Sequence, residues 1–359
     1  MIEVRKKILI APLDWGLGHA TRCIPIIREL QLKGCEVVIA SSGDALILLK
    51  TEFPELKYFE LTSYRATYSK YFPLILTIFF QLPKFLLIIQ KEHKELEIIV
   101  KEQQIDLAIS DNRYGCWTTM IPTVFLTHQV NIQMPFELKW LQGIINFFNH
   151  WQIRKFNYCW IPDFPSEGLT GKLTRHPNLK TKFIGILSRF KKVGPHDLQY
   201  DILAIISGPE HQRSVFESLV MKQLDNVPGK KLIVKGIPKL GCEITKSGSI
   251  DETNHLLSDK LNEVIESTEI IICRSGYSSI MDLAILQKKV VFIPTPGQTE
   301  QEYIAEELEK RGISYYQKQK DFNMVDAIEK SKKYAGFAGW NSDSNLLANA
   351  IDDLLLQHL

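Results

Sequence analysis

Short apolar segments alternate with segments of helical periodicity along this chain, and this alternation restricts the fold more than any other feature. Strands joined by helices form a parallel sheet with helices on both faces. In the first half, one such helical segment, Cys23–Leu32, follows the first of six predicted strands. These strands are Lys7–Ala11, Glu36–Ala40, Lys57–Leu61, Ile105–Ser110, Thr123–Leu126 and Tyr158–Ile161.

The same pattern restarts in the second half of the chain. The predicted strands there are Asp201–Ile206, Lys231–Lys235, Glu269–Cys273, Val290–Ile293 and Ile313–Tyr316. The predicted helices are Gln212–Leu224, Asp259–Ser267, Ser278–Leu286 and Glu300–Lys310. The sequence therefore predicts an α/β protein of two doubly wound, Rossmann-like domains that face each other across a cleft.

The junction between the two domains is expected within Leu187–Leu198, which contains glycine, proline and several charges. We expect a first domain over residues 1–190 and a second over residues 191–340. Residues 341–359 contain a last helical segment, Ser342–His358. This segment can pack against either domain, and we expect it to pack against the first.

Composition excludes several functional classes. The chain has 359 residues, 45% hydrophobic and 23% charged, as in soluble globular proteins. A net charge of +2 does not indicate general nucleic-acid binding. The six cysteines form no CxxC pair, so we expect no zinc site. The apolar run within residues 1–12 is too short for a signal peptide, and we expect a cytoplasmic protein.

The first candidate site follows the first predicted strand, at Gly16, Gly18 and His19. Two glycines allow a ligand to approach the backbone closely, and the helix that follows offers free N–H groups to an anion. The third glycine of a dinucleotide-binding motif is replaced by Thr21. The alternative is a helix-capping turn that carries a surface histidine.

Further polar residues follow the fourth and fifth predicted strands. Asp111 ends the fourth strand at the same sheet edge as His19, where a carboxylate acts as a general base or orients the histidine. An Asx-turn or a helix cap is the alternative for this residue. His128 and Gln129 follow the fifth strand, and we expect them to line an acceptor site.

Three loops of the second half have ligand-binding patterns. Ser207 and Gly208 form a small turn before a helix, typical of a phosphate or base cradle. Asp282 lies in the first turns of the predicted helix Ser278–Leu286, where its carboxylate can accept two ribose hydroxyls. The third loop offers paired hydrogen bonds to sugar hydroxyls from Gln301 and Glu302. The residues of the Ser-Gly turn before Asp282 are Arg274, Ser275, Gly276, Tyr277 and Ser278.

The run CRSGYSSIMDLAILQKKVVFIPTPGQTEQEYIAEEL resembles the donor-site region of GT-B glycosyltransferases, specifically the MurG-like UDP-GlcNAc transferases of family 28 type. GLGHATR resembles the first glycine loop of the same family. The resemblance implies that Asp282 holds the ribose and that Ser275–Ser278 bind the diphosphate. It also implies donor-site roles for Arg189, for Gln301 with Glu302, and for a uracil-binding stretch near Leu257.

The resemblance implies an inverting glycosyltransferase that moves a sugar, an N-acetylhexosamine by expectation, from a UDP-sugar to a hydroxyl acceptor. The acceptor is expected to be a lipid-linked or cell-envelope glycan. No cofactor and no metal ion are expected, because helix N-termini stabilise the leaving diphosphate. The general base is either His19 or Asp111. The alternatives are a UDP-sugar hydrolase of the pseudaminic acid pathway type and a catalytically inactive GT-B partner subunit.

Two apolar segments raise the question of membrane contact. Fourteen of the twenty residues of Tyr71–Gln90 are large and apolar, but Pro73, Pro83 and Lys84 interrupt the run, so it is not a spanning helix. It is either a core-packed helical hairpin or a surface that enters the lipid interface. Trp140–Phe148 is a similar segment. The second alternative predicts a peripheral protein at the inner face of the plasma membrane.

Overall fold

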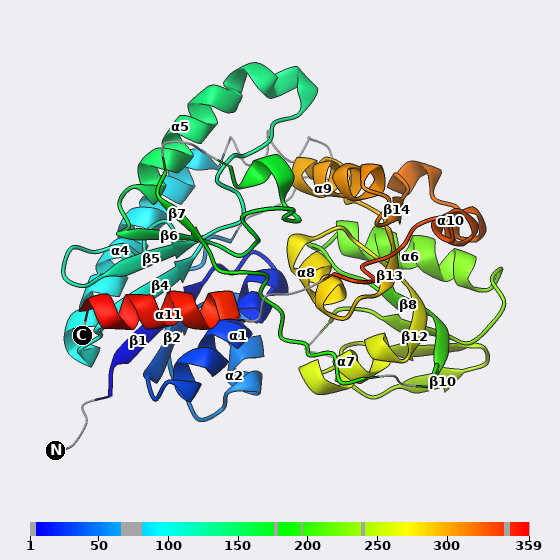
Figure 1. The fold of residues 1–359 in the computed structure, drawn as a ribbon, viewed down its shortest axis with the longest axis horizontal. Coiled ribbons are helices and arrows are strands. Elements are labelled where there is room, and N and C mark those ends of the chain that lie inside the picture. Colours follow the sequence, from blue (N-terminus) through cyan, green and yellow to red (C-terminus); the bar gives the residue numbers. More distant parts are fainter. Residues whose placement is uncertain are drawn as a thin grey trace. The chain divides into compact units, whose positions relative to one another are not determined.

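A computed structural model describes residues 5–65, 81–175, 179–194, 197–237, 241–340 and 345–358 of the chain. The contacts divide it into two compact units (Figure 1). Unit 1 comprises residues 1–187 and 342–359, and unit 2 comprises residues 188–341. Each unit contains a seven-stranded sheet with helices on both faces, which confirms the prediction of two doubly wound domains.

The sheet of unit 1 has the order β3-β2-β1-β4-β5-β6-β7, and all of its neighbouring strands are parallel. Its strands are β1 (Lys7–Pro12), β2 (Glu36–Ser41), β3 (Lys57–Glu60), β4 (Leu107–Asp111), β5 (Thr123–Leu126), β6 (Tyr158–Ile161) and β7 (Thr181–Phe183). Six of the seven were predicted. The sequence analysis missed β7, a three-residue edge strand whose residues are all half-buried and which therefore lacks a buried apolar run.

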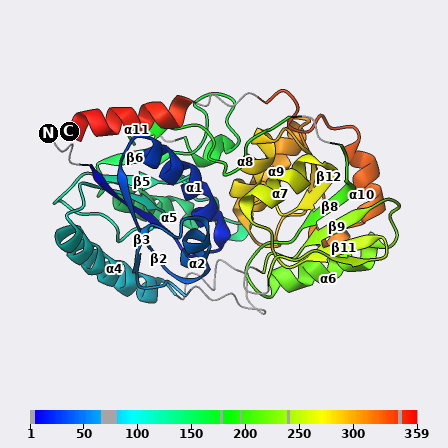
Figure 2. The same ribbon diagram turned by 90° about the horizontal axis from the view of Figure 1, so that it is seen from below.

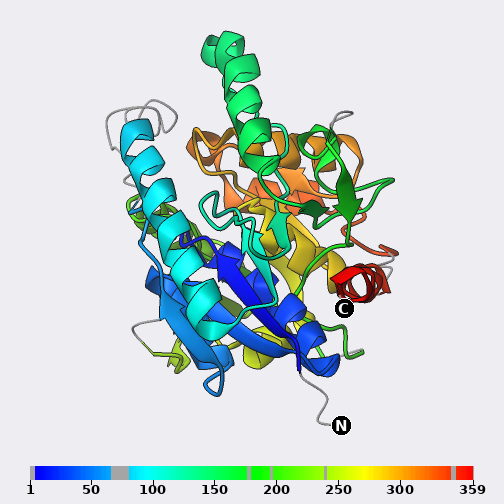
Figure 3. The ribbon, with the colours of Figure 1, turned by 90° about the vertical axis from the view of Figure 1, so that its left-hand side faces the viewer.

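Helices cover both faces of this sheet. Figure 2 shows α4 (Leu82–Gln103) and α11 (Asn345–His358) on opposite sides of it. α1 (Leu17–Leu32) and α2 (Gly43–Glu52) pack beside each other, while Leu96 of α4 belongs to the core on the other face. The 3-10 helix η1 (Phe136–Leu141) leads into α5 (Gln142–Ile153), and Figure 3 shows α5 extending away from the sheet.

The sheet of unit 2 has the order β10-β11-β9-β8-β12-β13-β14. Its strands are β8 (Tyr200–Ile205), β9 (Lys231–Val234), β10 (Thr245–Ser247), β11 (Ile250–Thr253), β12 (Thr268–Cys273), β13 (Lys289–Phe292) and β14 (Tyr315–Tyr316). β10 pairs antiparallel with β11, and the other neighbours are parallel. The sequence analysis missed this hairpin because its strands, TKS and IDET, are largely polar.

α6 (Gln212–Leu224) and α10 (Met324–Ser331) share one core with the strands of unit 2. Figure 2 shows α7 (Ser258–Glu266) and α8 (Tyr277–Ile285) on the other side of the sheet. The remaining helix, α9 (Thr299–Lys310), contacts β14.

The last helix, α11, belongs to unit 1 although it follows unit 2 in the sequence. It contacts α1, and Lys33 Nζ lies 2.6 Å from Asp352 Oδ1. Lys182 forms a second ion pair with Asp353. The chain therefore returns to its first unit after completing the second.

Only part of the predicted apolar segment Tyr71–Gln90 can be compared with the structure, since residues 71–80 lie outside the described residues. From Leu82 onward the segment forms the start of α4, where Phe85 is buried while Leu86 and Leu87 are exposed. Within the described ranges, no helix combines the length and the apolar character needed to cross a membrane.

Candidate active site

Four side chains meet at the carboxyl edge of the unit 1 sheet, and we call them the histidine–arginine cluster: His19, Arg22, Asp111 and His128. The parallel register aligns Pro12 of β1 with Asp111 of β4, so that α1, which follows β1, begins beside the end of β4. His19 Nδ1 lies 3.1 Å from Asp111 Oδ1. His19 and Asp111, which the sequence predicted at one sheet edge, are therefore in direct contact.

Arg22 joins the members of this cluster. Its Nε donates to Asp111 Oδ2 at 2.6 Å, and its Nη2 donates to Asp111 Oδ1. Its Nη1 lies 2.7 Å from Nδ1 of His128, and its Nη2 lies 2.9 Å from Nδ1 of His19. The Asp111 carboxylate thus accepts hydrogen bonds on both oxygens from one guanidinium.

Burial distinguishes the members of the cluster. The side chains of Arg22 and Asp111 are fully buried and His128 is buried, whereas the side chain of His19 is 15% exposed. His19 is therefore the member that a dissolved substrate can reach most directly.

The charges in the cluster set the proton affinities of its groups. Burial by itself raises the pKa of the Asp111 carboxyl, but the charges of Arg22 and His19 and their hydrogen bonds outweigh it and hold this pKa well below its usual range. Burial lowers the pKa of His19, the charges of Arg22 and His128 add to this effect, and Asp111 opposes it. At neutral pH, Asp111 is ionised and weakly basic, while His19 is neutral and able to accept a proton.

The turn before His19 is shorter than predicted. Only Gly16 requires a glycine conformation, with φ of 81° as the residue that precedes α1. Because α1 begins at Leu17 instead of Cys23, Gly18 and His19 lie in its first turn. The sequence analysis placed the start too late because a first helical turn that faces a site needs no apolar periodicity.

The alternative interpretations of His19 and Asp111, a surface histidine and an Asx-turn or helix cap, do not fit the contacts of these residues. The His19 ring is bonded to Asp111 and is not a detached surface side chain. Asp111 bonds the side chains of Arg22 and His19, whereas an Asx-turn or a helix cap would direct its carboxylate to backbone N–H groups.

The other predicted acceptor-lining residue, Gln129, lies beside His128 in the loop after β5. Its backbone N–H donates to Thr127 Oγ1 at 3.0 Å, and its carbonyl accepts from Asn149 Nδ2 of α5 at 3.1 Å. These bonds fix the loop that carries His128.

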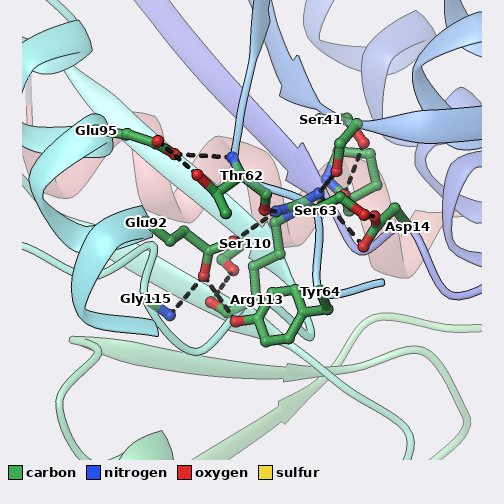
Figure 4. Close-up of polar contacts among 12 residues, drawn as sticks. Asp14, Ser41, Thr62, Ser63, Tyr64, Glu92, Glu95, Ser110, Arg113 and Gly115 are labelled. Carbon is green, nitrogen blue, oxygen red and sulfur yellow. Dashed lines mark hydrogen bonds and ion pairs between the residues drawn. The ribbon is translucent and has the colours of Figure 1, made fainter. Parts of the chain in front are cut away.

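A second buried network lies next to the cluster and is centred on Arg113, two residues after Asp111 (Figure 4). Arg113 donates to the carbonyl of Pro12 at 2.8 Å and to Glu92 Oε1 of α4 at 2.5 Å. Glu92 also accepts from the Tyr64 hydroxyl at 2.8 Å and from the Gly115 N–H at 2.9 Å. The Arg113 and Glu92 side chains are fully buried, so this network fixes the loop after β4 to helix α4.

In unit 2, the predicted donor loops converge at the carboxyl edge of β12 and β13. Ser275 Oγ donates to the carbonyl of Gln301 at 2.9 Å, which joins the turn before α8 to the start of α9. Gln301 Oε1 accepts from the N–H of Thr295, and Glu302 Oε1 accepts from the N–H of Gly297 at 3.2 Å. Gly276, Tyr277 and Ser278 form the N-terminus of α8 in the same turn.

Asp282 of α8 binds the segment that opens unit 2. Its Oδ1 accepts from Ser188 Oγ at 2.5 Å. Burial raises the pKa of the Asp282 carboxyl to about 6, although the Arg189 charge, the Ser188 hydroxyl and the Arg189 backbone N–H act in the opposite direction. Arg189 in turn places Nη1 3.3 Å from Ser258 Oγ, beside Leu257 of the expected base-binding stretch. The structure thus brings Asp282, Arg189 and this stretch together.

Arg274 is oriented into the interior of unit 2. Its Nη1 donates to the carbonyls of Ile293 and Pro294, its Nη2 donates to Gln319 Oε1 at 2.6 Å, and its guanidinium lies over the Phe216 ring. Burial lowers its pKa to about 9. These contacts fix the loop after β13 rather than direct a charge to the sheet edge.

The remaining predicted loop follows β8. Gly208 has φ of 116°, which only glycine adopts readily, and Ser207 precedes it at the strand end. Glu210 beside them binds Arg213 of α6 at 2.6 Å. The loop therefore leads into α6 within a few residues.

Sequence analysis did not identify Arg22 and Ser188 as site residues. Arg22 lies three residues after His19, so both project from one face of α1. That spacing is the one sequence signal that indicates their proximity. Ser188 has no comparable signal, because its contact with Asp282 spans 94 residues.

Comparison with known protein families gives a match within unit 2. Residues 245–336 match the glycosyltransferase family 28 C-terminal domain. These residues lie in unit 2. This match covers β10 to α10 and includes Asp282, Gln301 and Glu302.

Curated relatives point to the same family. A UDP-N-acetylglucosamine–N-acetylmuramyl-(pentapeptide) pyrophosphoryl-undecaprenol N-acetylglucosamine transferase of Sulfurihydrogenibium is 22% identical over 47% of this chain and 51% of its own length. The Flavobacterium psychrophilum protein of the same name is 33% identical over 29% of each chain. An uncharacterized glycosyltransferase of Methanosarcina acetivorans is 24% identical over 85% of this chain and 84% of its own. The chain spans about half or less of the first two relatives.

Solved structures establish the fold of the whole chain. The kitacinnamycin glycotransferase has a TM-score of 0.69 at 14% identity and covers 99% of this chain and 100% of its own. MurG of Acinetobacter baumannii has a TM-score of 0.59 at 13% identity, and the match covers 98% of this chain and 99% of the MurG chain. The fold is GT-B, and the predicted resemblance to MurG-like glycosyltransferases is confirmed.

Proposed function

We propose that this protein is an inverting glycosyltransferase that moves a sugar, an N-acetylhexosamine, from a UDP-sugar to a hydroxyl acceptor. The observation that carries the proposal is the contact of His19 with Asp111 at the carboxyl edge of a parallel sheet, in a chain whose other unit has a family 28 domain. Ligands of doubly wound sheets bind at this edge.

The chemistry follows from the proton affinities of the cluster. His19, neutral at neutral pH, takes the proton of the acceptor hydroxyl as that oxygen attacks the anomeric carbon of the donor. The bond from the anomeric carbon to the diphosphate breaks, and UDP leaves. A single displacement of this kind inverts the anomeric centre. Asp111 stabilises the imidazolium that forms, because its carboxylate stays ionised beside the ring.

Unit 2 supplies the donor site in this proposal. The turn of Ser275–Ser278 opens α8, whose N-terminal N–H groups and helix dipole stabilise negative charge on the diphosphate. Asp282 accepts hydrogen bonds from the ribose, and Gln301 and Glu302 contact the sugar. The reaction needs no metal ion, because backbone donors stabilise the leaving group.

The proposal is tested by analysis of products. The full chain is incubated with UDP-N-acetylhexosamines, EDTA and polyprenyl diphosphate-linked acceptors. We expect a new glycoside and UDP, at a rate that Mg²⁺ or Mn²⁺ does not increase. Free sugar without glycoside would identify a hydrolase instead, and absence of both products would favour an inactive partner subunit. A rate that depends entirely on added metal would contradict the metal-free donor site.

Asp282→Ala should weaken UDP binding by about 1–3 kcal/mol, the range for loss of a hydrogen-bond partner with charge. Because its carboxyl pKa is about 6, UDP affinity of the parent protein should fall as the pH drops below 6 and the carboxylate gains a proton. Titration calorimetry measures both effects. Ser188→Ala is the matched control, since it removes the same internal hydrogen bond and leaves the carboxylate. Equal UDP affinity of Asp282→Ala and the parent would contradict the assignment.

We further propose that unit 1 contacts an anionic membrane surface, which places the enzyme near a lipid-linked acceptor. The names of the first two curated relatives include an undecaprenol-linked acceptor. Large apolar side chains of η1 and α5 are exposed. These are Phe136, Trp140, Ile144, Phe147, Phe148 and Trp151, which we call the α5 patch.

Positive charge accompanies the α5 patch. Three cations, Lys139, Arg154 and Lys155, belong to residues 136–155, where Glu137 is the one acidic residue. Lys155 Nζ lies 4.0 Å from the centre of the Trp151 ring. Aromatic side chains beside cations are typical of helices that lie in a lipid interface. Leu86 and Leu87 of α4 extend the exposed apolar surface of unit 1.

Replacement of Phe147 and Phe148 with serine should lower binding to phosphatidylglycerol vesicles about tenfold or more, because two apolar side chains leave the interface. The melting temperature should not change, since these side chains are 63% and 57% exposed. Vesicle sedimentation and thermal unfolding measure the two effects. Leu32→Ser, at an 81% exposed position of α1, is the control. Unchanged vesicle binding of the double variant would contradict the membrane contact. A dimeric parent protein that becomes monomeric in the double variant would also contradict it.

A further inference from the structure

Arg22 has an unusual position for a buried cation, because it contacts every other member of the histidine–arginine cluster. Its side chain is 1% exposed and lies one helical turn after His19. Two of its nitrogens donate to the two oxygens of Asp111, and the third lies 2.7 Å from His128 Nδ1. A planar guanidinium can make these bonds simultaneously, whereas the single ammonium of lysine cannot.

This arrangement determines which group can accept a proton. Both Asp111 oxygens already accept hydrogen bonds from a permanent cation, so protonation of the carboxylate would break a buried ion pair. Arg22 cannot accept a proton or a hydrogen bond, since a guanidinium has donors alone. The His128 Nδ1 that faces Arg22 Nη1 is therefore the acceptor of that bond.

We propose that Arg22 is a positioning residue for proton transfer: it binds both oxygens of Asp111 and contacts His19 and His128, so that His19 and not Asp111 accepts the proton of the substrate. The proposal deepens the proposed function and rests on it for the role of His19. The arrangement of Arg22 itself is a property of unit 1 and can be measured without any substrate.

In the described part of the chain, three elements contribute charged or titratable groups near His19. Arg22 lies on α1, Asp111 ends β4, and His128 follows β5. Burial, Arg22 and His128 lower the pKa of His19, and Asp111 raises it. Removal of the Arg22 charge should therefore raise this pKa, and removal of the Asp111 charge should lower it.

The test is a pH titration of the His19 imidazole by NMR in the full chain, paired with the pH dependence of sugar transfer. In Arg22→Gln, the His19 pKa and the acid limb of kcat/KM should both move about one unit to higher pH, the size typical of one nearby charge. In Arg22→Lys, which keeps the charge, the pKa should stay at the parent value. The kcat of this variant should fall about 10- to 100-fold, because the orientation of His19 is lost.

The matched control is Arg113→Gln, at the fully buried arginine of unit 1 that follows β4. Arg113 bonds Glu92 and Pro12 rather than Asp111, so this variant should lose stability without moving the His19 titration. If Arg22 had only a structural role, replacing either arginine with glutamine would lower stability and leave the His19 pKa unchanged. An unmoved His19 pKa in Arg22→Gln would overturn the proposal.

Two further measurements keep the proposal testable if Arg22→Gln does not fold. Asp111→Asn should move the His19 pKa to lower pH, opposite to the effect of Arg22. A parent-level kcat in Arg22→Lys would overturn the positioning role. If the parent protein transfers no sugar, the proposed function fails, while the NMR titrations still decide whether Arg22 controls His19.

Discussion

His19→Ala should lower kcat for sugar transfer by about 10²- to 10⁴-fold, the usual contribution of a general base. Its UDP affinity should match that of the parent protein, because the donor-binding residues belong to unit 2 and His19 to unit 1. The fold should be retained, since His19 is partly exposed and Arg22 still pairs with Asp111. Initial rates with saturating donor, together with calorimetric titration of UDP, measure the two quantities.

Asp111→Ala is the informative comparison with His19→Ala. It removes the partner of Arg22 and leaves a buried guanidinium without its carboxylate, so a loss of stability should accompany its loss of activity. Rates are therefore compared per folded molecule. If His19→Ala retains the parent rate while folded Asp111→Ala is inactive, Asp111 is the base. If both variants remain active, the catalytic site lies elsewhere.

Arg113→Met should destabilise unit 1 by about 3–5 kcal/mol, the range for a buried ion pair that loses one partner. Glu92 would remain fully buried with a charge that Arg113 no longer compensates. The loop after β4, which follows Asp111, would also lose its bond to the Pro12 carbonyl and its link to α4. Urea denaturation of the full chain measures the free energy of unfolding.

A neighbouring residue of the same helix provides the control for this prediction. Lys91 precedes Glu92 on α4, but its side chain is 67% exposed and its Nζ lies 3.8 Å from Glu95 Oε1. Lys91→Ala should change the free energy of unfolding by less than about 1 kcal/mol, as for other exposed pairs. Equal stabilities of Arg113→Met and Lys91→Ala would show that the buried network contributes little.

The apolar pattern was sufficient to predict the fold class and most of the elements. Buried parallel strands need continuous apolar runs, and β1, β5 and β6 are recognisable for this reason. Several of the missed elements do not need such runs. β10 and β11 form a largely polar hairpin at the sheet edge, and α10 is a short helix of eight residues. Local composition carries little information about such elements.

The order of strands and helices also placed His19 and Asp111 at one sheet edge, because parallel strands align their carboxyl ends. The contacts that give these residues their chemistry depend on tertiary structure. The β1–β4 register aligns Pro12 with Asp111, and only this register brings Arg22 to a carboxylate 89 residues away. The charge and hydrogen bonds of Arg22 then lower the proton affinity of Asp111 despite its burial, which supports the proposal that His19 is the base. Sequence order indicates which residues share an edge, whereas proton affinity depends on distances and burial that exist only after the sheet has formed.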